Sequence, residues 1–327
     1  MTKRNMGTPA LWQVLVAFAA VYLIWGSTYL AIRYAVETIP PFLMAGTRFV
    51  IPGALLFVFL RARGVPMPTR SQWKAAAIIG GLLLLGGNGF VSWSEQRVPS
   101  GIAALLVAMV PLWMTLLEAI RSRTIPRAQI IAGLALGLAG ILLLVGPGEF
   151  TSAGARIDLI GLGGLIVASI SWAIGSLYAR HADLPHAPLM GTAIEMLMGG
   201  LLLWMVGLGQ GEAARVQFAH ISTSSLLGVL YLIFFGSLGG FSAYTWLLRV
   251  TTPARASTYA YVNPVVAVFL GWAIAGEPLT IQTIVATAII IGSVVLITTS
   301  RSAAGSADHS GPAIEGGLAE AQAPISE

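Results

Sequence analysis

An uncharged stretch of 21 residues, from Ala256 to Gly276, limits what this chain can fold into. As a helix it is long enough to cross a hydrocarbon core of about 30 Å. Pro264 stands near its middle, and a proline inside a helix frees the carbonyl four residues earlier. In lipid that carbonyl has to face protein or a water-filled cavity. The stretch therefore predicts a kinked transmembrane helix with one face turned to an interior cavity.

The rest of the chain has the same character. Of its 327 residues, 56% are hydrophobic and 9% are charged, whereas soluble domains are about 25% charged. The apolar run that starts at Leu11 is too long for the core of a cleaved signal peptide, so we interpret it as a first membrane helix. Ten apolar spans separated by Pro, Gly and charged clusters predict an all-α integral membrane protein, with spans near residues 11–32, 41–60, 74–95, 100–120, 128–146, 158–179, 188–208, 224–248, 253–276 and 280–300.

The basic residues give the orientation of these spans. Thirteen of them lie at one set of span ends and four at the alternate ends. Because Lys and Arg accumulate in cytoplasmic loops, both termini are expected in the cytoplasm. The net charge of +5 comes from these short loops, so it does not indicate nucleic-acid binding. Residues 301–327 are small and polar, which predicts a disordered cytoplasmic tail.

The two halves of the chain resemble each other. At an offset of 147 residues Trp25 and Pro41 match Trp172 and Pro188, and at an offset of 153 Gln129 matches Gln282. Pro111 likewise matches Pro264, so a second helix kink is expected there. Five spans per repeat means that the halves cross the membrane in opposite senses. Inverted repeats of this kind form a binding site near the midplane and permit alternating access.

Polar and aromatic side chains follow one helix face in four of the spans. The aromatic rings can stack on a flat ligand or hold an ammonium group, and the amides and hydroxyls can bond a ligand's amino or carboxylate group. The same residue types also pack helices against each other, and any single one has that ordinary explanation. The candidate binding residues are Trp25, Tyr29, Asn88, Ser92, Trp172, Ser176, Tyr259 and Asn263. Tyr261 lies on another face of its helix and is expected to pack.

Charges inside the membrane are costly and usually face a cavity or a partner. Arg48 and Glu195 each stand seven residues after the matching prolines, roughly 10 Å along a helix. We interpret them as candidate gating or proton-coupling residues, with a structural polar contact as the alternative. Glu118 lies close to Arg121 and Arg123, where a local ion pair is expected.

No sequence pattern supports catalysis, nucleotide binding or metal binding. The chain has no cysteine, which excludes disulfides and thiolate metal sites. No nucleotide-binding or hydrolase motif stands in a strand–turn–helix setting. We therefore predict no cofactor and no metal site, and we expect no enzymatic activity.

Five motifs carry a family resemblance: WGSTYLAIR (25–33), VPSGIAALLVAMVPLW (98–113), ISWAIGSLYAR (170–180), IEMLMGG (194–200) and YAYVNPVVAVFLGWAIAGEPLT (259–280). They resemble the ten-helix EamA-domain members of the drug/metabolite transporter superfamily. The resemblance implies two EamA-type repeats at residues 11–146 and 158–300. It also implies metabolite export across a cell inner membrane, and several ten-helix members export amino acids.

Three functions remain to be separated. The first is a monomeric exporter of amino acids, aromatic and other apolar ones foremost. The second is an exporter of cationic drugs coupled to protons through Glu195. Four-helix drug–proton exchangers of the superfamily use a Glu in helix 1, and no acidic residue lies between Leu11 and Ile32 here. The third, a membrane enzyme or receptor, is disfavoured because the intramembrane ionisable residues are few and separated.

Overall fold

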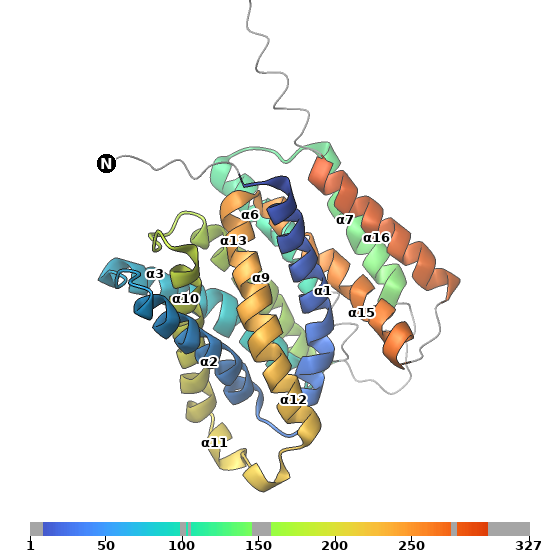
Figure 1. Cartoon of the computed structure of the whole chain (residues 1–327). Helices are drawn as coiled ribbons and strands as arrows, with labels where there is room; N and C mark the ends of the chain where they lie inside the picture. Colours follow the sequence, from blue (N-terminus) through green and yellow to red (C-terminus); the bar gives the residue numbers. More distant parts are fainter. Residues whose placement is uncertain (1–8, 99–102, 104–105, 146–157, 276–279, 300–327) are drawn as a thin grey trace, which may run out of the picture.

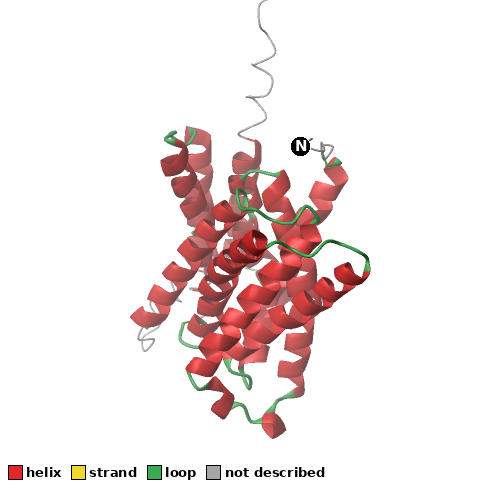
Figure 2. Ribbon diagram, turned by 90° about the vertical axis from the view of Figure 1, so that its left-hand side faces the viewer, coloured by secondary structure: helices red, strands yellow, loops and turns green. Residues whose placement is uncertain are grey.

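The computed structural model describes residues 9–98, 103, 106–145, 158–275 and 280–299, and all regular structure within them is helical (Figures 1 and 2). In the first half the elements are α1 (Leu11–Val36), α2 (Pro41–Ala62), α3 (Arg70–Gly80), η1 (Gly81–Gly89), α4 (Phe90–Ser94), α6 (Val110–Ser122) and α7 (Ala128–Val145). In the second half they are α9 (Leu159–Ala179), α10 (Pro188–Gly209), α11 (Glu212–Arg215), η2 (Phe218–His220), α12 (Thr223–Tyr231), η3 (Leu232–Phe241), α13 (Ser242–Val250), α14 (Pro253–Ala256), α15 (Tyr259–Ala275) and α16 (Ile281–Thr299).

Six of the ten expected spans form helices that are long and apolar enough to cross a membrane. Two of these helices are continuous through a π-helical segment, namely α3–η1–α4 and α12–η3–α13. Shorter apolar helices lie at Ala128–Gly140 and Ile284–Ile297. The predicted tail at 301–327 lies outside the described residues. The described part of the chain is thus all-helical, with the helix lengths and apolar composition expected of a multi-pass membrane protein.

The span expected from residue 253 onward is not one helix. It divides into α14 and α15 at Ser257 and Thr258, which are both fully buried. The Thr258 hydroxyl donates to the Arg255 carbonyl at 2.7 Å and bonds the Tyr22 hydroxyl at 2.6 Å. Side chains thus satisfy polar groups at the break, as an apolar interior requires.

The two prolines expected to kink helices differ in position. Pro264 lies inside α15, whereas Pro111 lies in the first turn of α6, after a turn at Ala108 and Met109. A proline in the first helical turn costs no hydrogen bond because that N–H has no intrahelical partner. Pro111 therefore begins a helix instead of kinking one.

Helices α2 and α10 cross at very short range, and the contact repeats with the halves exchanged. A Cβ atom on Gly53 would lie 3.1 Å from the Ala193 carbonyl oxygen, and one on Gly200 would lie 3.0 Å from that of Gly46. Residues 53 and 46 correspond to 200 and 193 at the offset of 147. Only glycine permits this approach at either place.

A second reciprocal contact joins α7 and α16, which lie side by side at one edge of the bundle (Figure 1). Gln129, near the start of α7, donates to the Leu296 carbonyl at 3.2 Å. Gln282, near the start of α16, donates to the Leu143 carbonyl at 2.7 Å. The two helices therefore run antiparallel and exchange equivalent hydrogen bonds.

Helix α2 is also held by an acidic residue from the other half. The Glu212 carboxylate, 1% exposed, accepts hydrogen bonds from the backbone N–H groups of Phe42 at 3.3 Å and Leu43 at 2.8 Å. A carboxylate at a helix N-terminus satisfies free donors and complements the helix dipole. This cap fixes the helix that carries Arg48.

Candidate functional site

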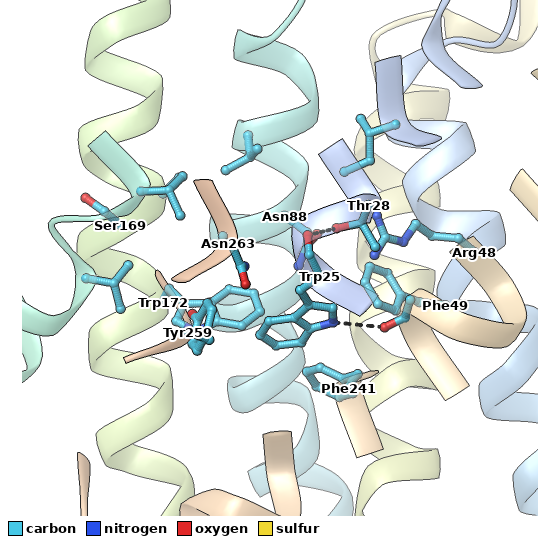
Figure 3. A pocket seen from close by; sticks show the side chains of 17 residues that line it. Trp25, Thr28, Arg48, Phe49, Asn88, Ser169, Trp172, Phe241, Tyr259 and Asn263 are labelled. Carbon is cyan, nitrogen blue, oxygen red and sulfur yellow. Dashed lines mark hydrogen bonds between the residues drawn. The ribbon is translucent and has the colours of Figure 1, made fainter. Parts of the chain in front are cut away.

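A narrow cavity lies among helices of both halves, and about 70 Å³ of it is open to the centre of a water molecule. That is room for a few waters at most. Its lining comes from α1, α2, η1, α4, α6, α9, η3, α15 and the residue Val107 before α6 (Figure 3). The lining residues are Trp25, Thr28, Ile32, Arg48, Phe49, Gly87, Asn88, Val91, Val107, Val110, Ala168, Ser169, Trp172, Gly236, Phe241, Tyr259 and Asn263.

Aromatic rings form one wall of this cavity. The Trp25 ring lies edge-on to Trp172 at 5.6 Å and to Tyr259 at 4.9 Å between centroids. Tyr244, from α13, lies 5.1 Å from Trp25 and accepts a hydrogen bond from Trp172 Nε1 at 3.0 Å. Edge-to-face packing and that hydrogen bond hold the rings in fixed orientations.

Each tryptophan rests on a glycine of a π-helical segment. A Cβ atom on Gly240 of η3 would lie 2.4 Å from Trp25 Nε1, and one on Gly87 of η1 would lie 2.5 Å from Trp172 Cε3. Gly87 and Gly240 correspond at the offset of 153, as the tryptophans do at 147. π-Helical turns are uncommon and often occur at functional sites. Here they supply the bare backbone on which the indole rings lie.

The polar part of the cavity contains Arg48, which is 3% exposed. Its guanidinium lies 4.7 Å above the Phe49 ring, and its Nε donates to the Ser237 hydroxyl over a long 3.5 Å. Its Nη1 has no hydrogen-bond partner among the described residues. Glu95 is the acidic group with which Arg48 interacts electrostatically, and no ion pair within 4.0 Å joins them in the described part of the chain.

Asn263 supplies an amide to the same cavity. Its side chain is 2% exposed, and its Oδ1 is buried without a hydrogen-bond partner in the described structure. Asn88, from η1, contributes a second amide to the lining. Buried polar atoms are nearly always paired, so one without a protein partner indicates a ligand or water position.

The structure brings together five of the eight candidate binding residues. Trp25, Asn88, Trp172, Tyr259 and Asn263 line the cavity.

Ser92 and Ser176 do not line the cavity, since both are fully buried between helices. The Ser176 hydroxyl bonds the Tyr244 hydroxyl at 2.6 Å, so it orients a ring instead of facing the cavity. The side chain of Tyr29 lies outside what the structure describes. Tyr261 packs in an apolar cluster between α15, α7 and α16, as expected.

Glu195 occupies a different environment from Arg48, although the two positions are equivalent in the repeats. It is 1% exposed on α10 and does not line the cavity. Its electrostatic partner is Arg249 of α13, again without an ion pair within 4.0 Å in the described residues. Position 48 thus carries a basic residue and position 195 an acidic one, and each interacts with a residue of the opposite type at the end of the following long helix.

A second cavity, which sequence reasoning did not anticipate, lies between α6, α14 and α16. About 310 Å³ of it is open to the centre of a water molecule, and Glu118 and Arg255 contribute to its lining. The ion pair expected for Glu118 is not formed in the described structure. Arg121 instead donates to the ring of His181 at 2.9 Å, while Glu118 keeps a buried Oε2 without a partner. Helical spacing alone does not show which way a side chain at a helix end will turn.

Comparisons with known proteins agree with this architecture. Residues 11–146 and 159–299 each match the EamA-like transporter family. The chain is 44% identical over 291 residues to the uncharacterized inner membrane transporter YedA of Escherichia coli K12, covering 87% of this chain and 90% of YedA. It is 27% identical over 282 residues to the uncharacterized transporter YoaV of Bacillus subtilis, covering 83% and 92%. A protein crystal structure has a TM-score of 0.70 with 21% identity, covering 88% of this chain and 97% of its own, and shows likeness of fold alone.

Proposed function

The chain belongs to the EamA-like transporter family, and from that premise we propose that it exports amino acids, aromatic and other apolar ones foremost, through the central cavity. The protein is a multi-pass inner-membrane transporter and not an enzyme. Its substrates are small molecules. The amino-acid class, the direction and the path through the cavity are the proposal.

The composition of the cavity wall is the observation that supports this substrate class. Aromatic rings from α1, α9 and α15 meet a guanidinium and two amides in one narrow space. When the cavity widens during transport, an apolar side chain can lie against the rings, while the polar backbone moiety can bond the amides and the guanidinium. None of the described residues that line the cavity is acidic. A cationic drug would therefore meet the like charge of Arg48 and no acidic lining residue to pair with, so the cavity does not favour drug export.

The proposal includes ten transmembrane helices in two inverted repeats, residues 11–146 and 158–300, with cytoplasmic termini and a monomeric chain. Reciprocal contacts support the symmetry. Glycines pair α2 with α10, glutamines pair α7 with α16, and each tryptophan rests on the π-helical glycine of the other half. An inverted repeat allows the two halves to exchange conformations, which is the basis of alternating access.

We propose that Arg48 and Glu195 act at the two gates, with Glu95 and Arg249 as their counter-charges. In each couple, one residue lies on a helix of the close α2–α10 crossing, and its counter-charge lies at the end of the next long helix along the chain. Because a buried charge is costly without its partner, separating either couple requires compensation. A bound substrate or a proton can compensate the charge that loses its partner.

Flux into proteoliposomes tests the proposed function. Phenylalanine, threonine, lysine and a quaternary amine are each compared in protein-containing and empty vesicles. We expect saturable flux of phenylalanine and threonine, with little flux of the quaternary amine. Transport of the amine without the amino acids would refute the proposal.

A further inference from the structure

Two buried polar groups of opposite hydrogen-bonding character face the same cavity without protein partners. Arg48 has a free donor at Nη1, and Asn263 has a free acceptor at Oδ1, within the part of the chain that the structure describes. Figure 3 shows Arg48 beside Thr28 and Phe49 on one side of Trp25, with Asn263 on the other side. A ligand between them meets a positive donor at one end and a neutral acceptor at the other.

The surroundings of Arg48 leave its guanidinium available. The Phe49 ring covers one face, and the Ser237 hydroxyl takes up only Nε at the outer limit of hydrogen bonding. Burying a guanidinium is expensive unless a carboxylate or comparable acceptor pairs with it. Glu95 interacts with this guanidinium only from a distance, without a close ion pair in the described structure. The unpaired Nη1 group of Arg48 therefore suits a planar anion that can bond the guanidinium at short range.

We propose that Arg48 binds the carboxylate of the substrate and that Asn263 accepts a hydrogen bond from its ammonium group. The transported compounds are then zwitterionic α-amino acids with a free carboxylate, whose side chain lies against the aromatic wall. This assignment rests on the proposed function and narrows it. Amides, esters and simple amines of the same side chain are excluded as good substrates.

The test is ligand binding to the purified full-length protein, measured by calorimetry. The panel contains phenylalanine, phenylalaninamide, phenethylamine and 3-phenylpropionate, which differ only in carboxylate and ammonium groups. Loss of a hydrogen bond to a charged group weakens binding by roughly 10- to 100-fold. We expect that weakening for phenylalaninamide and phenethylamine. A smaller loss is expected for 3-phenylpropionate, because it keeps the carboxylate.

Arginine variants identify the group that reads the carboxylate. Arg48→Gln should bind phenylalanine and phenylalaninamide with similar, weak affinity, and Arg48→Lys should keep part of the preference. Arg63→Gln is the matched control, because Arg63 also lies over a phenylalanine ring, Phe59 at 5.0 Å, but on the exposed end of α2. It should retain the full preference.

The outcomes separate this inference from the proposed function. Equal binding of phenylalanine and phenylalaninamide by the wild-type protein overturns the role of Arg48 and leaves amino-acid export standing. If phenylalanine, the panel compound with both a carboxylate and an ammonium group, does not bind, the role of Arg48 and amino-acid export are both overturned. If Arg48→Gln does not fold, the wild-type panel still decides, because it needs no variant.

Discussion

The Trp25 ring depends on a glycine that leaves it no room to spare. The Cβ atom of Gly240→Ala would lie 2.4 Å from Trp25 Nε1 and 2.7 Å from its Cδ1, where normal contacts are about 3.5 Å. The indole must therefore move by about 1 Å. That shift strains or breaks the 3.1 Å hydrogen bond from Trp25 Nε1 to the Gly236 carbonyl. The cavity, with about 70 Å³ open to water, is the available space for the ring.

The cost follows from three contributions. Overpacking costs about 1–3 kcal/mol, and the lost hydrogen bond costs about 1 kcal/mol. Replacing glycine by alanine in a helix returns about 1 kcal/mol. The net loss of stability is therefore about 1–3 kcal/mol. The phenylalanine flux should fall by more than the loss of folded protein alone would cause, because the displaced ring occupies the binding cavity.

The assay combines thermal unfolding of the detergent-solubilised protein with phenylalanine flux in proteoliposomes. Gly239→Ala is the matched control, since it lies in the same π-helical segment and its Cβ would be 3.4 Å from the nearest atom, Ile24 Cδ1. We expect Gly240→Ala to lower both the unfolding temperature and the flux, and Gly239→Ala to leave them nearly unchanged. Wild-type flux and stability in Gly240→Ala would refute the steric reasoning.

Three further changes test other parts of the structure. Trp172→Ala should lower phenylalanine flux about 2- to 10-fold through lost ring contacts, with Trp172→Phe as the control; equal flux in both variants contradicts a stacking role. Glu195→Gln should reduce flux and flatten its pH dependence, measured from mildly acidic to mildly alkaline buffer; unchanged flux and pH dependence would exclude coupling through that carboxylate. The backbone N–H of Gly161, with further hydrogen bonds, lowers the pKa of Asp158 below its ordinary 3.8, so the stabilisation by this helix cap is present above that pH and fades below it. Asp158→Asn should remove the share of the acid-induced fall in unfolding temperature that comes from Asp158, and an identical pH profile in the variant would contradict this.

Much of the site was predictable because it depends on periodicity and repetition. Trp25 and Trp172 stand at equivalent places in two helices, and Tyr259 and Asn263 share a helix face by their spacing of four. Those features do not depend on how the helices pack against each other. The depth of Arg48 followed in the same way from its distance to Pro41.

The remainder depended on tertiary contacts that periodicity does not encode. Tyr244 of α13 supports the aromatic wall through tertiary contacts, because Ser176 and Trp172 of α9 bond its hydroxyl. The break at Ser257 and Thr258 was missed because Ser and Thr are common inside membrane helices. Tyr22, which is distant in sequence, supplies a hydrogen bond that stabilises the break.

The charges at positions 48 and 195 make the two ends of a symmetric fold chemically different. The close backbone contacts of one half recur at corresponding positions of the other half. The charged residues do not follow this pattern, because Arg48 lines the cavity while Glu195 interacts with Arg249 outside it. A cavity lined by both residues would neutralise itself and offer a carboxylate no preferred end. In the proposed mechanism only Arg48 faces the ligand, so a zwitterion would bind in one orientation and its carboxylate would compete with Glu95 for the same guanidinium. In that mechanism, substrate binding weakens one charge couple and leaves the other intact, so the two gates respond differently to the same substrate.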